Sequence, residues 1–320
     1  MSKSYEKINY AVRPAKNIER RMLCEALRRL VEFGRLETYR YIGFGSTFFT
    51  DFSLFHKSLG ITNNLSIERD EENRARFEFN KPYKCIKIEF GNSNSVIPTL
   101  DWEAKTIIWL DYDYKLDQSV LTDVASFCSK AIPGSVIIVT VDARPSIDID
   151  QRLEELRSKV GEDKVPPELS SKPQAAAQML ADWGTADFSR KIIHNEIEAT
   201  IKDRNGLKEA GNKLQYKQLF NFHYADGAKM LTVGGIIYDQ GQKRKLARCG
   251  FKQFEFVKTG IDPFTIEVPS LTLREIHHLD KQLPCEDLAT VDTRSIPDKD
   301  VELFARVYRY FPAFVDAEIG

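Results

Sequence analysis

The sequence predicts an α/β protein whose core is a mostly parallel sheet with helices packed around it. Between about residues 36 and 145, short runs of β-branched and aromatic residues alternate with stretches of helical periodicity, as in consecutive βαβ units. The runs at 105–113 and 135–143 are apolar enough to be strands buried on both faces. A turn signal at Asp226 and Gly227, between two further strand-like runs, predicts a hairpin.

The sheet is expected to have seven strands, with an antiparallel strand near its end. Each strand-like run is short and is followed by glycine, charged or turn-forming residues, which commonly end strands. In chain order the runs lie at 39–46, 65–70, 85–91, 105–113, 135–143, 219–239 (the hairpin) and 254–259.

The first predicted helix, at 14–34, shows how the helices are assigned. Pro14 suits the first position of a helix, apolar residues recur at helical spacing, and Gly34 follows as a stop signal. A capping box at Thr272 and Glu275 opens a later helix that runs to about Leu283. The other helical stretches lie at 48–60, 71–80, 117–131, 150–159, 174–201, 240–249 and 297–311.

The length of the chain indicates how many domains to expect. Its 320 residues exceed the size of about 100–200 residues that is usual for one domain, and 42% hydrophobic residues suffice for a sizeable core. We expect one α/β core with helical additions. The expected parts are an N-terminal helical arm at 1–35, a core at 36–145 and 214–268, a helical insertion at 146–213 that forms a lid or substrate region, and a C-terminal helical extension at 269–320.

Composition excludes several classes of protein. The net charge of −1 excludes a polycation adapted to DNA as a whole. The five cysteines are scattered without a CxxC pair, which excludes a disulfide framework or a structural zinc site. No apolar run approaches the about 18 residues of a membrane span, and no signal-peptide run opens the chain. We expect a cytoplasmic protein without a membrane partner, and its oligomeric state stays open.

A glycine-containing loop follows the first predicted strand, at Gly43, Phe44, Gly45 and Ser46. Glycine lets the backbone pass close to a ligand, and the helix that follows offers free N–H groups at its start. The alternative is a plain tight turn. A dinucleotide fingerprint requires a third glycine at position 48, which is Phe48, and this disfavours NAD.

Glu68 ends the second predicted strand. A carboxylate at this point can accept hydrogen bonds from both ribose hydroxyls, which is why adenosine-bearing cofactors favour an acid there. The alternative is an exposed acid at the end of a strand, paired with Arg69 or Arg74.

With this loop and this acid, the chain resembles the class I S-adenosylmethionine (SAM) dependent methyltransferases. Its layout is similar to that of bacterial O-methyltransferases. The resemblance covers about residues 36–145 and, more loosely, 216–268. YIGFGS resembles their first motif, and LSIERDEENRARFEFN resembles their second strand with its ribose-binding acid. FGNSNSVIPTL is similar to the segment beside adenine, IIWLDYDY to the fourth-motif strand and PGSVIIVTVD to the fifth strand.

The resemblance implies a Rossmann-like methyltransferase sheet and SAM as the cofactor. The chain departs from the family pattern where Tyr41 or Ile42 replaces the usual acid at the end of the first strand, and at Phe48. Family contacts to SAM carry over to Gly43, Gly45, Glu68, Asn92, Ser93 and Asp111. With their neighbours, the predicted cofactor-binding residues are Gly43, Phe44, Gly45, Ser46, Glu68, Arg69, Asn92, Ser93, Asp111 and Tyr112.

The catalytic candidates are Asp111, Asp113 and Tyr114, which leave the fourth strand at the edge where ligands bind in open α/β folds. Asp111 could accept hydrogen bonds from an acceptor amine, although the prolines of the corresponding family motif are absent. Asp111 or Asp113 could instead be a general base for a hydroxyl.

A third alternative is Mg²⁺ held by carboxylates that include Asp142, but Ala143 stands where the family has Asn, and no metal ligand is assigned. The plainest alternative is that Asp113 and Asp142 cap the adjoining loops.

Three N-terminal cations are the candidate acceptor-binding residues. On a helix that starts at Pro14, Lys16 and Arg20 share a face and Arg13 enters from the preceding turn, so the three could converge on one anion. An anionic small molecule or a short RNA element would fit as the acceptor. The alternative is a solvated basic face compensated by Glu19.

The function predicted from the sequence is SAM-dependent O- or N-methyl transfer to an unidentified acceptor. Two alternatives remain open at this stage. One is an inactive methyltransferase-like module that binds a nucleotide or a protein, and the lesser one is an NAD(P)-dependent oxidoreductase.

Overall fold

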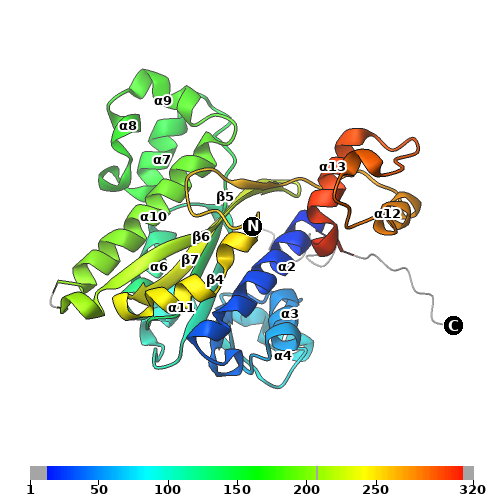
Figure 1. Ribbon diagram of the computed structural model, residues 1–320. Coiled ribbons are helices and arrows are strands. Elements are labelled where there is room, and N and C mark those ends of the chain that lie inside the picture. Colours follow the sequence, from blue (N-terminus) through cyan, green and yellow to red (C-terminus); the bar gives the residue numbers. More distant parts are fainter. Residues whose placement is uncertain (1–12, 207, 313–320) are drawn as a thin grey trace.

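A computed structural model describes residues 13–206 and 208–312, and it confirms the predicted α/β class. The sheet has eight strands in the order β3-β2-β1-β4-β5-β7-β6-β8 (Figure 1). Neighbouring strands from β3 to β5 are parallel, β7 is antiparallel to both β5 and β6, and β8 is parallel to β6. The strands are β1 (Arg40–Gly43), β2 (Asn63–Glu68), β3 (Ile86–Phe90), β4 (Thr106–Lys115), β5 (Val136–Asp142), β6 (Leu214–Ala225), β7 (Lys229–Asp239) and β8 (Phe264–Ile266).

Helices cover both faces of this sheet. Helices α2 and α3 pack on one face, and α6 and α10 pack on the other. Helices α7 to α9 lie beyond α10, whereas α12 and α13 form a separate lobe beside α2 (Figure 1). The helices are α2 (Pro14–Arg28), α3 (Thr50–Leu59), α4 (Arg74–Asn80), α5 (Ser93–Val96), α6 (Gln118–Lys130), α7 (Arg152–Val160), α8 (Pro167–Ser170), α9 (Pro173–Met179), α10 (Gly184–Arg204), α11 (Lys243–Arg248), α12 (Leu273–Asp280) and α13 (Asp298–Val307).

The strands alternate between two apolar cores. Along β4, Trp109 belongs to the core under α2, whereas Ile108 and Leu110 belong to the core under α6 and α10. A third, smaller core lies within the lobe of α12 and α13. Because both faces of β4 and β5 are covered by helices, the runs at 107–110 and 136–139 are wholly apolar and buried, as their sequences predicted. Among the described residues, no helix is both long and apolar enough to span a lipid bilayer.

The prediction for the last strand was wrong. Residues 254–259 form no strand, and β8 lies instead at Phe264–Ile266. The expected number of seven was also wrong: because the hairpin contributes two strands, the sheet has eight. The side-chain amide of Gln218 explains the difference, because it donates to the carbonyls of Lys258 (2.9 Å) and Gly260 (2.6 Å). Beside β6 the segment is therefore held by side-chain amides and by a single backbone hydrogen bond, from Lys258 N–H to the Leu219 carbonyl at 2.8 Å, and not by a ladder.

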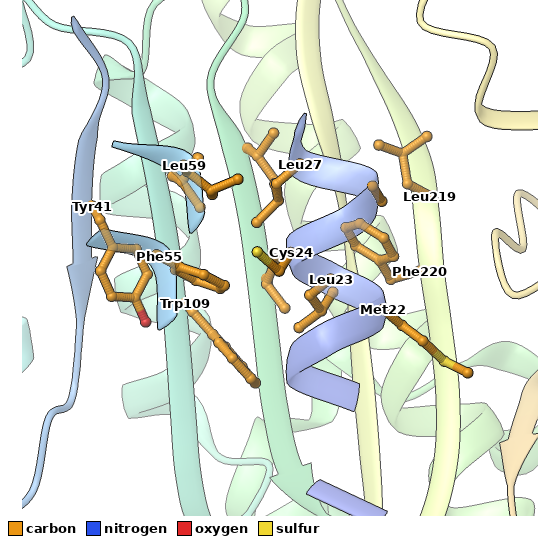
Figure 2. Packing of buried hydrophobic residues seen from close by; sticks show 14 of the residues in the cluster. Met22, Leu23, Cys24, Leu27, Tyr41, Phe55, Leu59, Trp109, Leu219 and Phe220 are labelled. Atoms are coloured by element: carbon orange, nitrogen blue, oxygen red, sulfur yellow. The ribbon is translucent and has the colours of Figure 1, made fainter. Parts of the chain in front are cut away.

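Helix α2 carries most of its apolar residues on the face toward the sheet. Figure 2 shows Met22, Leu23 and Leu27 packed near Trp109 and Phe220 of the underlying strands. The predicted helix at 14–34 is α-helical to Arg28 and continues as a tighter 3-10 helix to Phe33. Part of the predicted N-terminal arm, at 1–12, and the end of the C-terminal extension, at 313–320, lie outside the described residues.

The start of α2 is capped by a residue far along the chain. Arg13 occupies the N-cap position without a side-chain hydrogen bond, so the first amides of the helix need another acceptor. Asp226, at the turn between β6 and β7, supplies it, since its carboxylate accepts from the backbone N–H of Lys16 (2.9 Å) and Ala15 (3.3 Å). This contact fixes α2 to the hairpin.

We predict that Asp226→Ala lowers the free energy of unfolding by about 0.5–2 kcal/mol, the usual cost of losing a helix cap. Urea denaturation measures this change. Asp226→Asn keeps an acceptor oxygen and should lose less, and Asp262→Ala, which removes an exposed loop carboxylate, should change stability by under about 0.5 kcal/mol. Equal stability of Asp226→Ala and the wild type would contradict the cap.

Candidate active site

The carboxyl ends of β1, β2, β3 and β4 open into a cavity of about 830 Å³. The cavity contains every predicted cofactor residue except Gly43, together with the catalytic candidates and Arg20. These lining residues are Phe44, Gly45, Ser46, Glu68, Arg69, Asn92, Ser93, Asp111, Tyr112, Asp113, Tyr114 and Arg20. Residues from five separate elements therefore meet at one site, which is large enough for a nucleoside ligand.

The loop after β1 is tightly packed at both glycines. A Cβ atom at Gly43 would lie 2.6 Å from the hydroxyl oxygen of Tyr41, and one at Gly45 would lie 2.5 Å from the Phe49 ring. Ser46 and Phe49 adopt left-handed backbone conformations, with φ of 49° and 47°. Gly43 thus serves the packing of the turn, whereas Gly45 and Ser46 line the cavity with their backbone.

Glu68 is buried at the end of β2, and it is not the exposed acid of the simpler alternative. Only 7% of its surface is exposed, and its carboxylate accepts a hydrogen bond of 2.6 Å from the Ser66 hydroxyl. Ser66 in turn accepts from the backbone N–H of Gly45 at 2.9 Å. Arg74, the partner proposed in that alternative, instead bonds Glu71 at 2.7 Å.

Burial raises the pKa of Glu68 to about 7, and hydrogen bonds from Ser66, Gly45 and Ser46 oppose the rise without cancelling it. The folded protein therefore holds a proton on Glu68 between pH 4.5 and about 7, where the unfolded chain has released it. By linkage, this group stabilises the fold below pH 4.5, and its contribution is lost as the pH rises toward 7.

A buried polar network supports the opposite wall of the cavity. The Tyr112 hydroxyl donates to Asp123 on α6 at 2.6 Å, and the Asn94 amide donates to the other oxygen of Asp123 at 2.7 Å. The Phe44 ring meets Tyr112 edge-on at 5.2 Å. Asn94 and Asp123 were not among the predicted site residues, although an acid among the apolar positions of α6 indicates a buried partner.

Lys16 lies directly beneath Asp111. Its ammonium group is 2.9 Å from Asp111 Oδ1 and 2.8 Å from a Glu19 carboxylate oxygen, and it donates to the Tyr224 hydroxyl at 3.1 Å. It also lies 4.4 Å from the centre of the Trp109 ring. Burial lowers the pKa of Lys16, but the charges of Asp111 and Glu19 outweigh it and raise the pKa above its usual value.

Of the three N-terminal cations, Lys16 and Arg20 lie on the side of α2 that faces the site, whereas Arg13 does not join them. Arg13 donates to the backbone carbonyl of Asp226 at 3.2 Å, outside the cavity lining. Lys16 is 2% exposed beneath Asp111, and Arg20 is 4% exposed and lines the cavity. The face of α2 that carries Lys16 and Arg20 is thus buried, which contradicts the alternative of a solvated basic face.

Arg20 lies close to Asp51 on α3, which also lines the cavity. Burial raises the pKa of the Asp51 carboxyl group, and the positive charge of Arg20 opposes that rise. The Tyr41 hydroxyl of β1 donates a hydrogen bond to Asp51. Tyr41 occupies about the position where the family has an acid. Through its hydroxyl it positions Asp51, an acid that comes from the next helix.

Two carboxylates of the metal alternative, Asp111 and Asp142, are paired with cations. Asp142 is 4% exposed and accepts from the Arg144 guanidinium through both oxygens, at 3.0 and 2.9 Å, while Asp111 is paired with Lys16. Asp142 also caps its loop by accepting from the Arg144 backbone N–H at 2.8 Å. Within 13–206 and 208–312, no three His, Cys, Asp or Glu side chains are grouped as a metal site requires. This arrangement does not favour Mg²⁺.

A family model described as "Putative O-methyltransferase" matches residues 8–319. The chain belongs to this family. The match covers nearly the whole chain and confirms the predicted assignment to the SAM-dependent methyltransferases. A comparison with curated protein sequences found no match.

Several solved methyltransferase structures are similar to this chain. An O-methyltransferase family protein from Burkholderia thailandensis is 10% identical with a TM-score of 0.35, covering 69% of this chain and 56% of that one. Trm1 from Pyrococcus horikoshii, solved with SAM, is 10% identical with a TM-score of 0.40, covering 70% and 57%. N-methyltransferase NodS from Bradyrhizobium japonicum is 10% identical with a TM-score of 0.39, covering 69% and 97%. The match thus spans little more than half the length of the first two proteins.

The pKa of Glu68, about 7, predicts a pH-dependent affinity for S-adenosylhomocysteine (SAH). If the ribose hydroxyls donate to the charged carboxylate, the affinity should fall about tenfold from pH 8 to pH 6, because Glu68 is mostly protonated at pH 6. Calorimetric titration across this range measures the change. Glu68→Gln should bind more weakly at pH 8 and lose most of the pH dependence.

The matched control for this titration is Glu89→Gln, which changes an exposed acid on β3 and should retain the wild-type profile. An SAH affinity that does not change with pH in the wild type would contradict the role of Glu68.

Proposed function

We propose that this methyltransferase binds SAM in the cavity at the ends of β1 to β4 and methylates a hydroxyl group of its acceptor. One observation carries the proposal: a buried carboxylate, Glu68, faces a cavity that is bounded by a glycine loop and by the polar start of α5. Glu68 would accept hydrogen bonds from the ribose. Asn92 and Ser93 would lie beside adenine, and the loop at 43–46 would pass beneath the methionine end.

The cofactor supplies an electrophilic methyl group, which the acceptor oxygen takes by direct displacement while the carbon–sulfur electron pair returns to sulfur. The protein's task is to align the acceptor with this methyl group and to receive the proton of the hydroxyl. Two carboxylates on β4 are available, and their surroundings assign them different roles.

Asp111 suits hydrogen bonding better than proton transfer. Its Oδ1 atom is paired with the Lys16 ammonium at 2.9 Å, so a proton arriving there would have to compete with this ion pair. Asp113, two residues further along β4, is exposed at the cavity rim. We therefore assign the proton acceptor to Asp113 and propose that Asp111 binds the ammonium group of the methionine moiety.

The acceptor is proposed to be uncharged or cationic at the reacting end. Arg13 and Lys16, two of the cations considered for an anionic acceptor, are engaged with Asp226, Asp111 and Glu19. The cavity lining otherwise holds more acids than bases, among them Asp70, Glu71 and Glu72 at its edge. This charge balance disfavours the phosphates of an RNA acceptor.

We predict that Asp113→Asn lowers methyl transfer at least about 100-fold, since a general base typically contributes a factor of 10² to 10⁴. SAH affinity should stay within about threefold, because Asp113 is exposed and is not among the proposed ribose or adenine contacts. The assay follows labelled methyl from SAM into small-molecule, RNA and protein fractions of a cell extract, and then into the purified acceptor.

Asp163→Asn, a change at an acid on the surface and outside the cavity lining, serves as the matched control. Full activity of Asp113→Asn would remove this residue from the mechanism, and labelling on nitrogen would replace the hydroxyl acceptor by an amine. SAH binding without transfer into any fraction would favour a binding module, and competition by NAD would favour the oxidoreductase.

A further inference from the structure

Helix α2 places a buried guanidinium group in the wall of the cavity. Arg20 is 4% exposed and lines the cavity together with Asp51 and Asp111. Arginine is rarely buried to this extent unless it is paired with an anion. The cavity lining contains one other cationic side chain, Arg69, which follows Glu68 at the end of β2. Arg20 is thus the cation at the β1 and β4 end of the cavity.

The position of Arg20 is fixed by the first turn of its helix. Asp226 caps the start of α2, and Lys16, one turn before Arg20, is paired with Asp111 at 2.9 Å. Residues four apart lie on the same face of a helix, so the Lys16 contact directs Arg20 toward the same edge of the sheet. A guanidinium held in this way is preorganised for a planar anion such as a carboxylate.

The methionine moiety of SAM carries one carboxylate and one ammonium group, and this end of the cavity carries charges of both signs. Asp51 and Asp111 are suited to the ammonium group, and Arg20 is suited to the carboxylate. The acid usually found at the end of the first strand is replaced here, where Tyr41 bonds Asp51 instead. The charged groups available to the amino-acid end therefore lie on α2, α3 and β4.

We propose that Arg20 binds the carboxylate of the methionine moiety of SAM. The inference rests on the proposed function, because it requires the nucleoside to lie at Glu68 with its methionine end toward α2. The sequence predicted that Arg20 binds the acceptor, whereas this proposal assigns it to the cofactor. The competing explanation is a structural ion pair in which Arg20 only neutralises Asp51.

Two ligands that differ in the amino-acid moiety separate these explanations. SAH carries the carboxylate, whereas methylthioadenosine has the same nucleoside and sulfur without the amino-acid group. We predict that Arg20→Gln weakens SAH binding about 10- to 100-fold, as expected for the loss of a charge-assisted hydrogen bond. Methylthioadenosine affinity should change by less than about twofold, since its contacts at Glu68 are untouched. Calorimetric titration measures both.

Arg21→Gln is the matched control, because Arg21 is the neighbouring residue on α2 but is exposed. Arg20→Lys keeps the charge and loses the paired donors, so it should show a smaller loss that is again confined to SAH. If Arg20→Gln does not fold, Arg20→Lys provides the same comparison of the two ligands.

The outcomes are distinct. Unchanged SAH affinity in Arg20→Gln, or an equal loss for SAH and methylthioadenosine, would overturn the carboxylate contact and leave the proposed function standing. Failure of the wild type to bind either ligand would overturn both proposals.

Discussion

The buried ion pair between Lys16 and Asp111 is the contact on which the site depends. An unpaired ammonium group is too costly to bury, and Lys16 is 2% exposed. It is stabilised there by Asp111, Glu19 and the faces of nearby aromatic rings. Removing one partner from such a pair typically costs about 3–5 kcal/mol, because the other charge is left in a medium of low dielectric constant. The pair therefore holds α2 against the end of β4.

This constraint determines the chemistry of the cavity. Lys16 occupies the Oδ1 atom of Asp111, and for this reason we assign proton transfer to Asp113 at the rim. The same docking brings Arg20 to the cavity wall beside Asp51. The wall formed by Tyr112 does not depend on α2. It is held by the hydrogen bond from Tyr112 to Asp123 and by the polar groups around that bond. Helix α2 is thus part of the cofactor site as well as a cover for the sheet.

Site residues could be predicted from the sequence where the residues next to them in the chain show that a strand ends there. The glycine loop at 43–46, Glu68 and the Asn92 and Ser93 pair each lie at the end of a strand or just after it, so the strand pattern alone places them at one edge of the sheet. Contacts between distant segments could not be predicted, such as Lys16 with Asp111 and the cap from Asp226. Periodicity assigned Lys16 to one face of a helix without showing whether that face meets water or an acid. The strand predicted at 254–259 was wrong for the same reason, because the Gln218 side chain takes up carbonyls of residues 258 and 260 that strand pairing would have used.

The most direct measurement is a crystal structure of the protein with bound SAH. The account predicts that the ribose hydroxyls lie within hydrogen-bond distance of the Glu68 carboxylate and that adenine lies beside Asn92 and Ser93. It further predicts the SAH carboxylate at the Arg20 guanidinium and the sulfur facing Asp113 across the open side of the cavity. Density for the nucleoside outside this cavity, or in it with Glu68 away from the ribose, would contradict the account.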